Sequence, residues 1–192
     1  AEWPRLVGRE IGRLSVHSSI RAGDFQGTHV LRFLGDVRVA LCGALDTYCE
    51  RMVKDPDFHA VVIDLEQTEN LDSTALGCLA RLSIRVKKLN QRVPTLICNS
   101  SNLKRILSSM GFHDVFMIVD RAAYDALSLP ALPEGIELPA GTDLAMESTR
   151  ARVIAAHKQL MALNDTNAET FKDLVDALEQ EQRDGIPPSD AP

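Results

Sequence analysis

A serine at the expected start of a helix is the residue of this sequence best placed to do chemistry. Asp72 and Ser73 stand where helix-capping residues belong, immediately before an apolar helical pattern. A phosphate on such a hydroxyl meets free backbone N–H groups and the positive end of the helix dipole, and it changes the surface charge by about two units. We therefore predict a phosphorylation switch at Ser73, with Thr74 as a second acceptor. The alternative is that Ser73 is a plain capping residue, the commoner role of a serine before a helix.

The elements that position Ser73 are a buried strand and the helix that follows it. Residues 60–65 are β-branched and nearly all apolar, and the run is too short for a helix, so we expect a buried parallel strand. The helix is expected over residues 73–89. Its apolar face comprises Leu76, Leu79, Ala80, Ile84 and Leu89. Gly77 costs about 1 kcal/mol relative to alanine inside a helix, so we expect it to pack closely against the neighbouring strand or a partner.

The remaining sequence up to residue 127 alternates strands and helices. Residues 13–18 and 28–33 alternate in polarity and form an expected β-hairpin across a turn at residues 23–27. Further helices are expected over residues 41–52, 102–110 and 121–127 and further strands over residues 95–98 and 115–119, with Gly111 ending the second of these helices. A β-hairpin followed by alternating helices and strands predicts an α/β fold, a mixed central sheet with packed helices.

A helical hairpin is expected beyond this domain. Residues 128–141 are rich in proline and glycine and indicate a linker, and two helical patterns occupy residues 142–184. Thr142 is the expected cap of the first helix, and Thr166 opens a capping box with Glu169 in the second. The apolar stripes comprise Met146, Val153, Ile154, His157, Leu160 and Met161 in the first helix and Phe171, Leu174, Val175 and Leu178 in the second.

Such a hairpin cannot bury both apolar stripes by itself. We expect it to dock on the preceding domain, on a second copy in a homodimer, or on a partner protein. Its acidic outer face would then offer a second contact for a basic partner, or the hairpin would restrict access to Ser73 until a partner displaces it. The chain ends are expected to be a flexible N-terminal arm at residues 1–11 and a disordered tail at residues 185–192.

The charge distribution argues against binding of nucleic acid. The 192 residues carry a net charge of −6, and residues 142–192 alone hold ten acidic and five basic side chains. A surface that follows a phosphate backbone needs clustered lysine and arginine. The basic residues between positions 81 and 92 have instead the spacing of one solvated helix face.

The sequence contains no pattern typical of a catalytic, metal-binding or membrane protein. It has no Walker loop, G-x-S-x-G elbow or H-E-x-x-H sequence, and its four cysteines form no C-x-x-C pair. His157 lies on an apolar stripe and is expected to be a hydrogen-bonded core or interface residue. The acidic residues between positions 64 and 72 form a solvated loop or, alternatively, a cation site. No apolar run has transmembrane length, so we expect a cytoplasmic protein with no enzymatic activity, cofactor, metal or membrane contact.

Several segments together resemble the STAS domains of anti-sigma factor antagonists. They are the strand at residues 60–65, the acidic loop after it and the sequence Leu71-Asp72-Ser73-Thr74-Ala75-Leu76-Gly77. The resemblance continues through residues 96–98, residues 102–107 and the sequence Met110-Gly111-Phe112. It covers residues 12–127 and implies the STAS fold for that domain.

The resemblance implies that Ser73 is the modified residue, because the serine after the aspartate is the phosphorylation site of that family. It also implies a non-catalytic protein that binds an anti-sigma factor or serine kinase, is switched off by phosphorylation and is reset by a PP2C-type phosphatase. The expected partner-binding residues are Asp36, Arg38, Asp72, Thr74, Leu76 and Gly77. Many family members have a G-E-L-D or G-E-I-D pattern, and here Arg38 replaces its final aspartate. An arginine at this place would attract a phosphoserine rather than repel it.

The alternative function is that of a constitutive STAS accessory protein or a ligand-sensing scaffold, such as a subunit of a lipid-transport system. Such a protein binds a permanent partner and needs no phosphate cycle. A largely apolar exposed face would favour this alternative.

Overall fold

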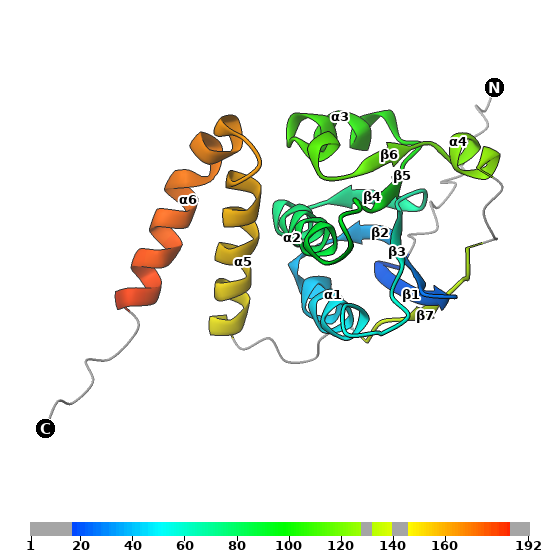
Figure 1. The fold of residues 1–192 in the computed structure, drawn as a ribbon. Helices are drawn as coiled ribbons and strands as arrows, with labels where there is room; N and C mark the ends of the chain where they lie inside the picture. Colours follow the sequence, from blue (N-terminus) through cyan, green and yellow to red (C-terminus); the bar gives the residue numbers. More distant parts are fainter. Residues whose placement is uncertain (1–16, 128–131, 140–145, 185–192) are drawn as a thin grey trace, which may run out of the picture.

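The computed structural model describes residues 17–127, 132–139 and 146–184. In these residues the chain forms a seven-stranded sheet and six α-helices (Figure 1), which confirms the predicted α/β class. The strands are β1 (Ser19–Phe25), β2 (Thr28–Val37), β3 (Ala60–Asp64), β4 (Thr68–Leu71), β5 (Thr95–Ile97), β6 (Met117–Val119) and β7 (Ile136–Glu137). The helices are α1 (Val39–Met52), α2 (Ser73–Asn90), α3 (Ser101–Ser109), α4 (Arg121–Ala126), α5 (Met146–Met161) and α6 (Asp165–Asp184), with a 3₁₀ turn η1 at Phe112–Asp114. The expected N-terminal arm, the cap Thr142, the side chain of Met146 and the expected tail lie outside the described residues.

The sheet is mixed and has the strand order β6–β5–β3–β2–β1–β7. Strands β2, β3, β5 and β6 are parallel, whereas β1 is antiparallel to both β2 and β7. The central strand β3 is buried along most of its length, as predicted. Beyond the end of its pairing with β3, strand β2 pairs with β4, which leads directly into α2.

The β-hairpin lies further along the chain than predicted. Of the strand expected over residues 13–18, the structure describes residues 17 and 18. These two residues precede β1, so the prediction is wrong for them. The turn expected over residues 23–27 is reduced to Gln26 and Gly27, whose φ angles are 50° and 77°. Two positive φ angles close a two-residue turn between antiparallel strands. The residues just before the turn therefore continue β1 and pair with β2.

Two short strands occupy segments expected to be loops. β4 forms within the acidic loop, where Thr68 is buried and its Oγ1 donates to the carbonyl oxygen of Phe33 at 2.8 Å. β7 forms within the expected linker and pairs with the edge strand β1. Segments of two to four residues take their strand geometry from an existing neighbour, which the periodicity of the sequence does not show.

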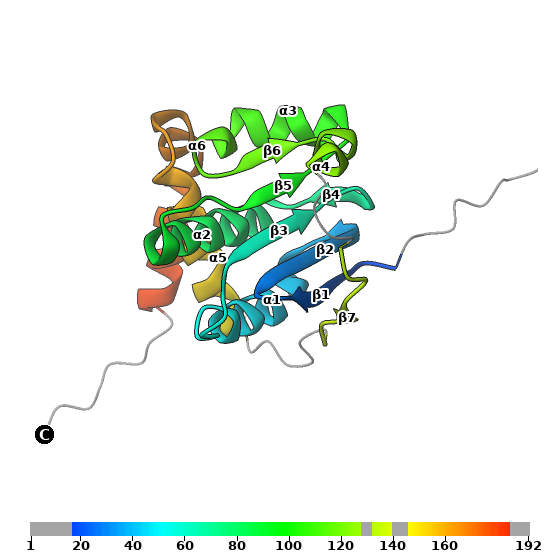
Figure 2. The ribbon, with the colours of Figure 1, turned by 45° about the vertical axis from the view of Figure 1, so that its right-hand side comes forward.

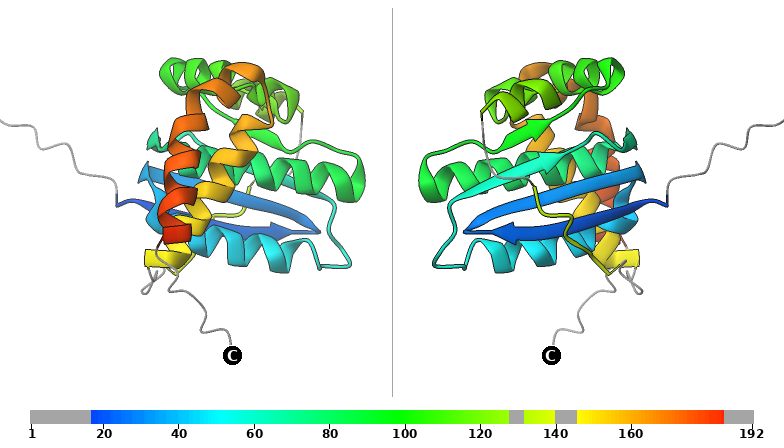
Figure 3. Two further views of the ribbon diagram at one scale, coloured as in Figure 1. Left: turned by 90° about the vertical axis from the view of Figure 1, so that its left-hand side faces the viewer. Right: turned by 90° about the vertical axis from the view of Figure 1, so that its right-hand side faces the viewer.

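One face of the sheet is covered by α1 and α2, which lie side by side (Figure 2). α5 packs on the outer side of α2, and α6 packs on α5, as the two side views in Figure 3 show. Ile63 of the sheet, Leu79 of α2, Leu160 of α5 and Phe171 of α6 belong to one buried cluster. Of the three docking places expected for the C-terminal hairpin, formed by α5 and α6, the structure shows the preceding domain.

The junction between α5 and α6 is fixed against the end of α3. The Nδ2 atom of Asn167 donates to the carbonyl oxygens of Met110, at 3.0 Å, and Leu160, at 2.9 Å. The cap of α6 is Asn164, whose side-chain oxygen accepts the backbone N–H of Asn167 at 2.8 Å. The predicted cap Thr166 is therefore wrong, because the helix begins before it.

Gly77 marks a close approach of α2 and α5. A Cβ atom built on Gly77 would lie 2.3 Å from the carbonyl oxygen of Ala156 in α5 and 2.7 Å from the Cα atom of that residue. The close packing expected of this glycine is present. Its neighbour is a helix of the same chain, rather than a strand or a partner.

We expect Gly77→Ala to weaken the docking of the C-terminal hairpin, because the added methyl group would overlap the backbone of Ala156. Amide hydrogen exchange in α5 and α6 should accelerate about tenfold, while the amides of β3 and β5 stay protected. Local exchange is the proper measure, because alanine also stabilises α2 itself. Lys87→Ala, on the exposed side of α2, is the control and should change neither region. Unchanged exchange in the glycine variant would contradict the close contact.

Candidate functional site

The residue before Ser73 joins the N-termini of two helices. Asp72 Oδ1 accepts the backbone N–H of Ala75 in α2 at 2.7 Å, and its Oδ2 accepts the backbone N–H of Val39 in α1 at 2.8 Å. The backbone N–H of Asp72 donates to the carbonyl oxygen of Val37 at 3.2 Å. One carboxylate therefore caps both α1 and α2, the helices that cover one face of the sheet, and fixes the backbone from which Ser73 projects.

Ser73 is the first residue of α2, and its side chain meets the docked hairpin. Its Oγ lies 2.8 Å from Nε2 of His157, a residue of α5 that is 2% exposed. Nδ1 of the same ring lies 2.8 Å from the carbonyl oxygen of Val153, which can only accept, so Nδ1 carries a hydrogen. In the neutral ring, Nε2 then accepts the hydroxyl hydrogen of Ser73. The ring also packs edge-on against Phe171 of α6, with centroids 5.0 Å apart.

Three of the expected partner-binding residues are buried. Thr74, Leu76 and Gly77 all lie in the first turns of α2, and each is buried in this structure. Gly77 lies directly beneath α5. A partner protein therefore cannot reach these three residues in this arrangement, and it is the docked C-terminal hairpin that covers Gly77.

The other expected partner-binding residues lie at the accessible edge of the site. Arg38 donates to Asp36 Oδ2 at 2.7 Å through Nε, and this hydrogen bond together with the charge of Asp36 raises the pKa of Arg38. Val37 at the end of β2 pairs with Leu71 at the end of the parallel strand β4. Arg38 follows Val37 directly, and Asp72 follows Leu71 directly. The structure therefore brings Arg38 to the same edge of the sheet as Ser73, with its side chain 69% exposed.

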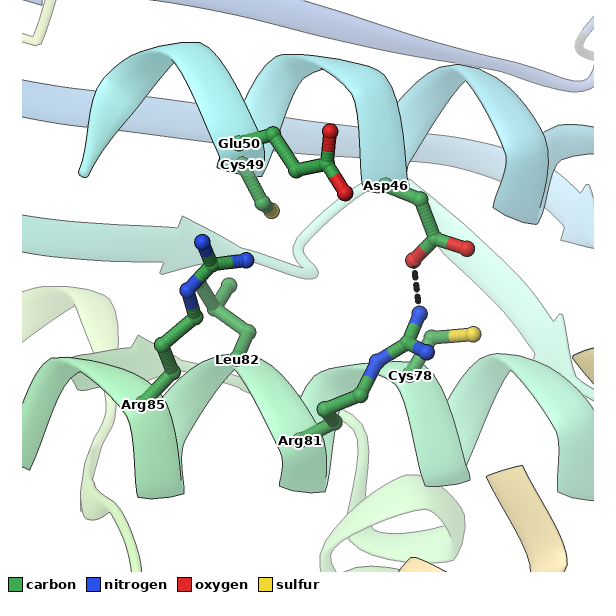
Figure 4. A pocket seen from close by; sticks show the side chains of 7 residues that line it. All are labelled: Asp46, Cys49, Glu50, Cys78, Arg81, Leu82 and Arg85. Carbon is green, nitrogen blue, oxygen red and sulfur yellow. Dashed lines mark hydrogen bonds and ion pairs between the residues drawn. The ribbon is translucent and has the colours of Figure 1, made fainter. Parts of the chain in front are cut away.

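A small cleft between α1 and α2 lies beside the hairpin contact. It has a volume of about 150 Å³ and is lined by Asp46, Cys49, Glu50, Cys78, Arg81, Leu82 and Arg85 (Figure 4). Asp46 of α1 pairs with Arg81 of α2 and, at 3.1 Å, with Arg152 of α5. The Asp46 carboxylate therefore connects the hairpin to both covering helices.

Neither the cysteines nor the acidic loop form a reactive or metal-binding site in the part of the chain that the structure describes. Cys42, Cys49, Cys78 and Cys98 are free and buried, and burial raises the pKa of Cys49 to about 12. Asp64 and Glu66 both accept hydrogen bonds from Arg121, at 2.8 and 2.6 Å, so arginine neutralises these carboxylates. The described residues include no group of three or more acidic, histidine or cysteine side chains that could hold a metal. None of the described helices is long and apolar enough to cross a membrane.

Sequence reasoning predicts Asp72 and Ser73 at the helix start but misses two of their connections. The bond from Asp72 to α1 spans 33 positions, and the bond from Ser73 to His157 spans 84. The one signal for the second connection is a polar ring on an otherwise apolar stripe, which predicts a hydrogen-bonded histidine without naming its partner. No sequence signal identifies the second helix that Asp72 caps.

Comparisons with known proteins place this site within a recognised domain. The model of the STAS domain family matches residues 20–126, more than half of the chain, and this segment contains Ser73. The search of curated proteins gave no significant match. Among solved structures, the chain is similar to the phosphorylated form of the Bacillus cell fate determinant SpoIIAA, with 11% identity and a TM-score of 0.48 over 58% of this chain and 100% of that chain.

Two further solved structures are similar over the same part of the chain. The unphosphorylated form of the anti-sigma factor antagonist SpoIIAA is 12% identical, with a TM-score of 0.48 over 57% of this chain and 96% of that chain. An anti-sigma factor antagonist from Mycobacterium paratuberculosis is 24% identical, with a TM-score of 0.47 over 57% of this chain and 91% of that chain.

Removal of the shared cap should cost more stability than removal of an ordinary cap. We expect Asp72→Ala to lower the free energy of unfolding by about 2 kcal/mol, since each lost capping bond costs about 1 kcal/mol. Asp120→Ala is the matched control, because Asp120 caps α4 alone, through the N–H of Ala123 at 2.7 Å, and should cost about 1 kcal/mol. Urea denaturation measures both values, and equal losses would contradict the double cap.

Proposed function

The chain belongs to the STAS domain family, and from that premise we propose that it is an anti-sigma factor antagonist controlled by phosphorylation of Ser73. In the unphosphorylated state it binds an anti-sigma factor or serine kinase through the start of α2 and the residues before it. A serine kinase phosphorylates Ser73 and ends that contact, and a PP2C-type phosphatase restores it. The protein acts in the cytoplasm by binding alone and uses no catalytic group or cofactor of its own.

The position of Ser73 at the N-terminus of an 18-residue helix is the observation that supports this proposal. The positive end of the helix dipole and the free N–H groups of the first turn stabilise a phosphate at that point. The hydrogen bond from the N–H of Ala75 to Asp72 fixes the backbone there, so a modified Ser73 would keep a defined place on the surface.

A phosphate at this position has an effect large enough for a switch. It adds about two negative charges at pH 7, directly beside the carboxylate of Asp72. An uncompensated charge in a desolvated contact costs several kcal/mol, and about 1.4 kcal/mol corresponds to a tenfold change in affinity. A partner that covers Ser73 would therefore bind the phosphorylated protein more weakly by a factor of about one hundred or more.

A second candidate function, a ligand-sensing scaffold or a constitutive accessory protein of a lipid-transport system, is favoured by an apolar cavity. The cavity has a volume of about 600 Å³ and lies where β2, β3, β5 and β6 begin, and its lining includes Phe25, Val30, Val62, Val93, Met117 and Tyr124. Phe25, Val93 and Met117 are exposed to solvent. A ligand or permanent partner bound there would need no phosphate cycle at Ser73, which lies beyond the opposite ends of these strands.

We expect Ser73→Asp to weaken partner binding about tenfold or more, because a carboxylate is added at the start of α2, and Ser73→Ala to bind constitutively. Ser101→Asp is the matched control, since Ser101 is the exposed first residue of α3, and it should leave the affinity unchanged. Phosphopeptide mapping after phosphorylation by a serine kinase, tested first with any that is encoded beside this gene, locates the modification. Phosphorylation elsewhere, with Ser73→Ala still switched, would contradict the proposal. Absence of phosphorylation would favour the second candidate.

Arg38→Asp should change the partner affinity or the rate of Ser73 phosphorylation while leaving the melting temperature nearly unaltered. The side chain is 69% exposed, and exposed ion pairs contribute at most about 1 kcal/mol to stability. Its charge nevertheless lies at the edge of the sheet from which α2 begins. Titration calorimetry and thermal unfolding measure the two effects. A large loss of stability with unchanged affinity and rate would show that Arg38 is structural.

A further inference from the structure

The face of α2 that carries Ser73 is occupied by a segment of the same chain. Ser73 and Gly77 are four positions apart and therefore lie on one side of the helix. Both contact α5, Ser73 through Nε2 of His157 and Gly77 through the backbone of Ala156. Two neighbouring residues of α5 thus cover the stretch of α2 that a partner protein would have to reach.

Polar contacts to three different elements hold the C-terminal hairpin at this place. His157 binds Ser73 of α2, and Arg152 binds Asp46 of α1. In the third contact the side chain of Asn167 donates to the carbonyl oxygen of Met110, which follows α3. His157 and Asn167 are each 2% exposed, so both would lose partners inside the protein if the hairpin left.

We propose that the C-terminal hairpin is an intramolecular competitor of the partner protein for α2, and that phosphorylation of Ser73 releases it. The proposal rests on the function proposed above, in which Ser73 is the phosphoacceptor. On the unphosphorylated protein the docked hairpin occupies the surface of α2 that the partner would bind. The partner therefore binds only the fraction of molecules in which the hairpin has moved away.

Phosphorylation removes the hydrogen that joins Ser73 to α5. The kinase transfers the γ-phosphoryl group of ATP to Ser73 Oγ, so that an Oγ–P bond forms, the bond from phosphorus to the ADP oxygen breaks, and the hydroxyl proton passes to the kinase. After the transfer, Oγ can no longer donate to Nε2 of His157. A buried acceptor is left without its donor, which costs about 1–3 kcal/mol.

The phosphate also has no room between the two side chains. Oγ and Nε2 are 2.8 Å apart, a separation that a phosphorus atom and its three oxygens cannot share. The histidine ring cannot move away toward α6, because Phe171 packs against it. α5 also cannot tilt closer to α2 at Gly77 to make room at Ser73, because the backbone of α5 already contacts Gly77. The remaining way to accommodate the phosphate in this direction is separation of α5 from α2.

This competition controls access in both directions. Ser73 is half-buried while the hairpin is docked, so a kinase reaches its hydroxyl more readily in the open molecule. A partner binds with an apparent affinity equal to its intrinsic affinity multiplied by the fraction of open molecules. Once phosphorylated, the chain stays open and presents its phosphoserine to a phosphatase. Removal of the phosphate lets the hairpin return and compete again.

Hydrogen exchange on full-length protein with phosphoserine installed at position 73 during translation tests this proposal. The expected result is exchange in α5 and α6 that is about tenfold faster or more, relative to the unmodified chain, with β3 and β5 still protected. Phosphoserine at position 101 is the matched control, since Ser101 also begins a helix, and it should leave α5 and α6 protected. Full protection of α5 in protein phosphorylated at Ser73 would overturn the proposal, because the phosphate would then point to solvent with the hairpin docked.

His157→Ala in the unphosphorylated full-length chain provides a second, independent measurement. It removes the acceptor for Ser73 and the ring that packs on Phe171, so exchange in α5 should accelerate and partner affinity should rise. Unchanged exchange would overturn the proposed contact. Both exchange measurements need neither kinase nor partner, so their failure is distinct from a failure of the proposed function, which phosphopeptide mapping decides.

Discussion

The arrangement of the candidate site depends on one carboxylate that two helices share. Asp72 accepts a backbone N–H from α1 and another from α2, so the positive ends of two helix dipoles converge on a single negative charge. The backbone of Ser73 is therefore fixed by both helices at once. A phosphate on Ser73 would face the same helix ends together with the charge of Asp72, and its energy depends on how fully water and free N–H groups solvate it. A docked helix that excludes water is the least favourable neighbour for such a charge.

α2 also has the features of a helix that carries another helix on its outer side. Gly77 costs about 1 kcal/mol of helix stability, and the three atoms nearest to a Cβ at this position all belong to Ala156 of α5. The hairpin contributes His157 and Asn167, two buried polar residues whose hydrogen bonds to Ser73 and Met110 form only when it is docked. Apolar stripes alone would allow α5 to slide along α2, whereas these bonds specify one position.

The unit that carries Ser73 could be predicted because its signals are local. The apolar run of β3 and the capping aspartate are adjacent in sequence, and α2 spans residues 73–90 where 73–89 was expected. The features that could not be predicted depend on residues far away in the sequence. Strands β4 and β7 form by pairing with β2 and β1. The choice among three docking places for the hairpin depends on the shape of α2. Thr166 and Asn164 are both good capping residues, and only the path of the chain into α6 selects Asn164.

The C-terminal hairpin and a partner can compete for one surface only if the free energy of hairpin docking is neither negligible nor too large for the partner to overcome. The buried hydrogen bonds and the ion pair of Arg152 with Asp46 contribute about 1 kcal/mol each. The side chains of Leu160 and Phe171 contribute about 1.5–3 kcal/mol each when fully buried, part of it within the hairpin itself. An uncompensated charge of several kcal/mol is of the size needed to shift such an equilibrium. A charge change at an exposed position such as Arg38 is worth less than about 1 kcal/mol and would leave the closed form dominant. The place for an effective switch is therefore the part-buried contact with His157, and Ser73 is the helix-terminal hydroxyl that the structure puts there.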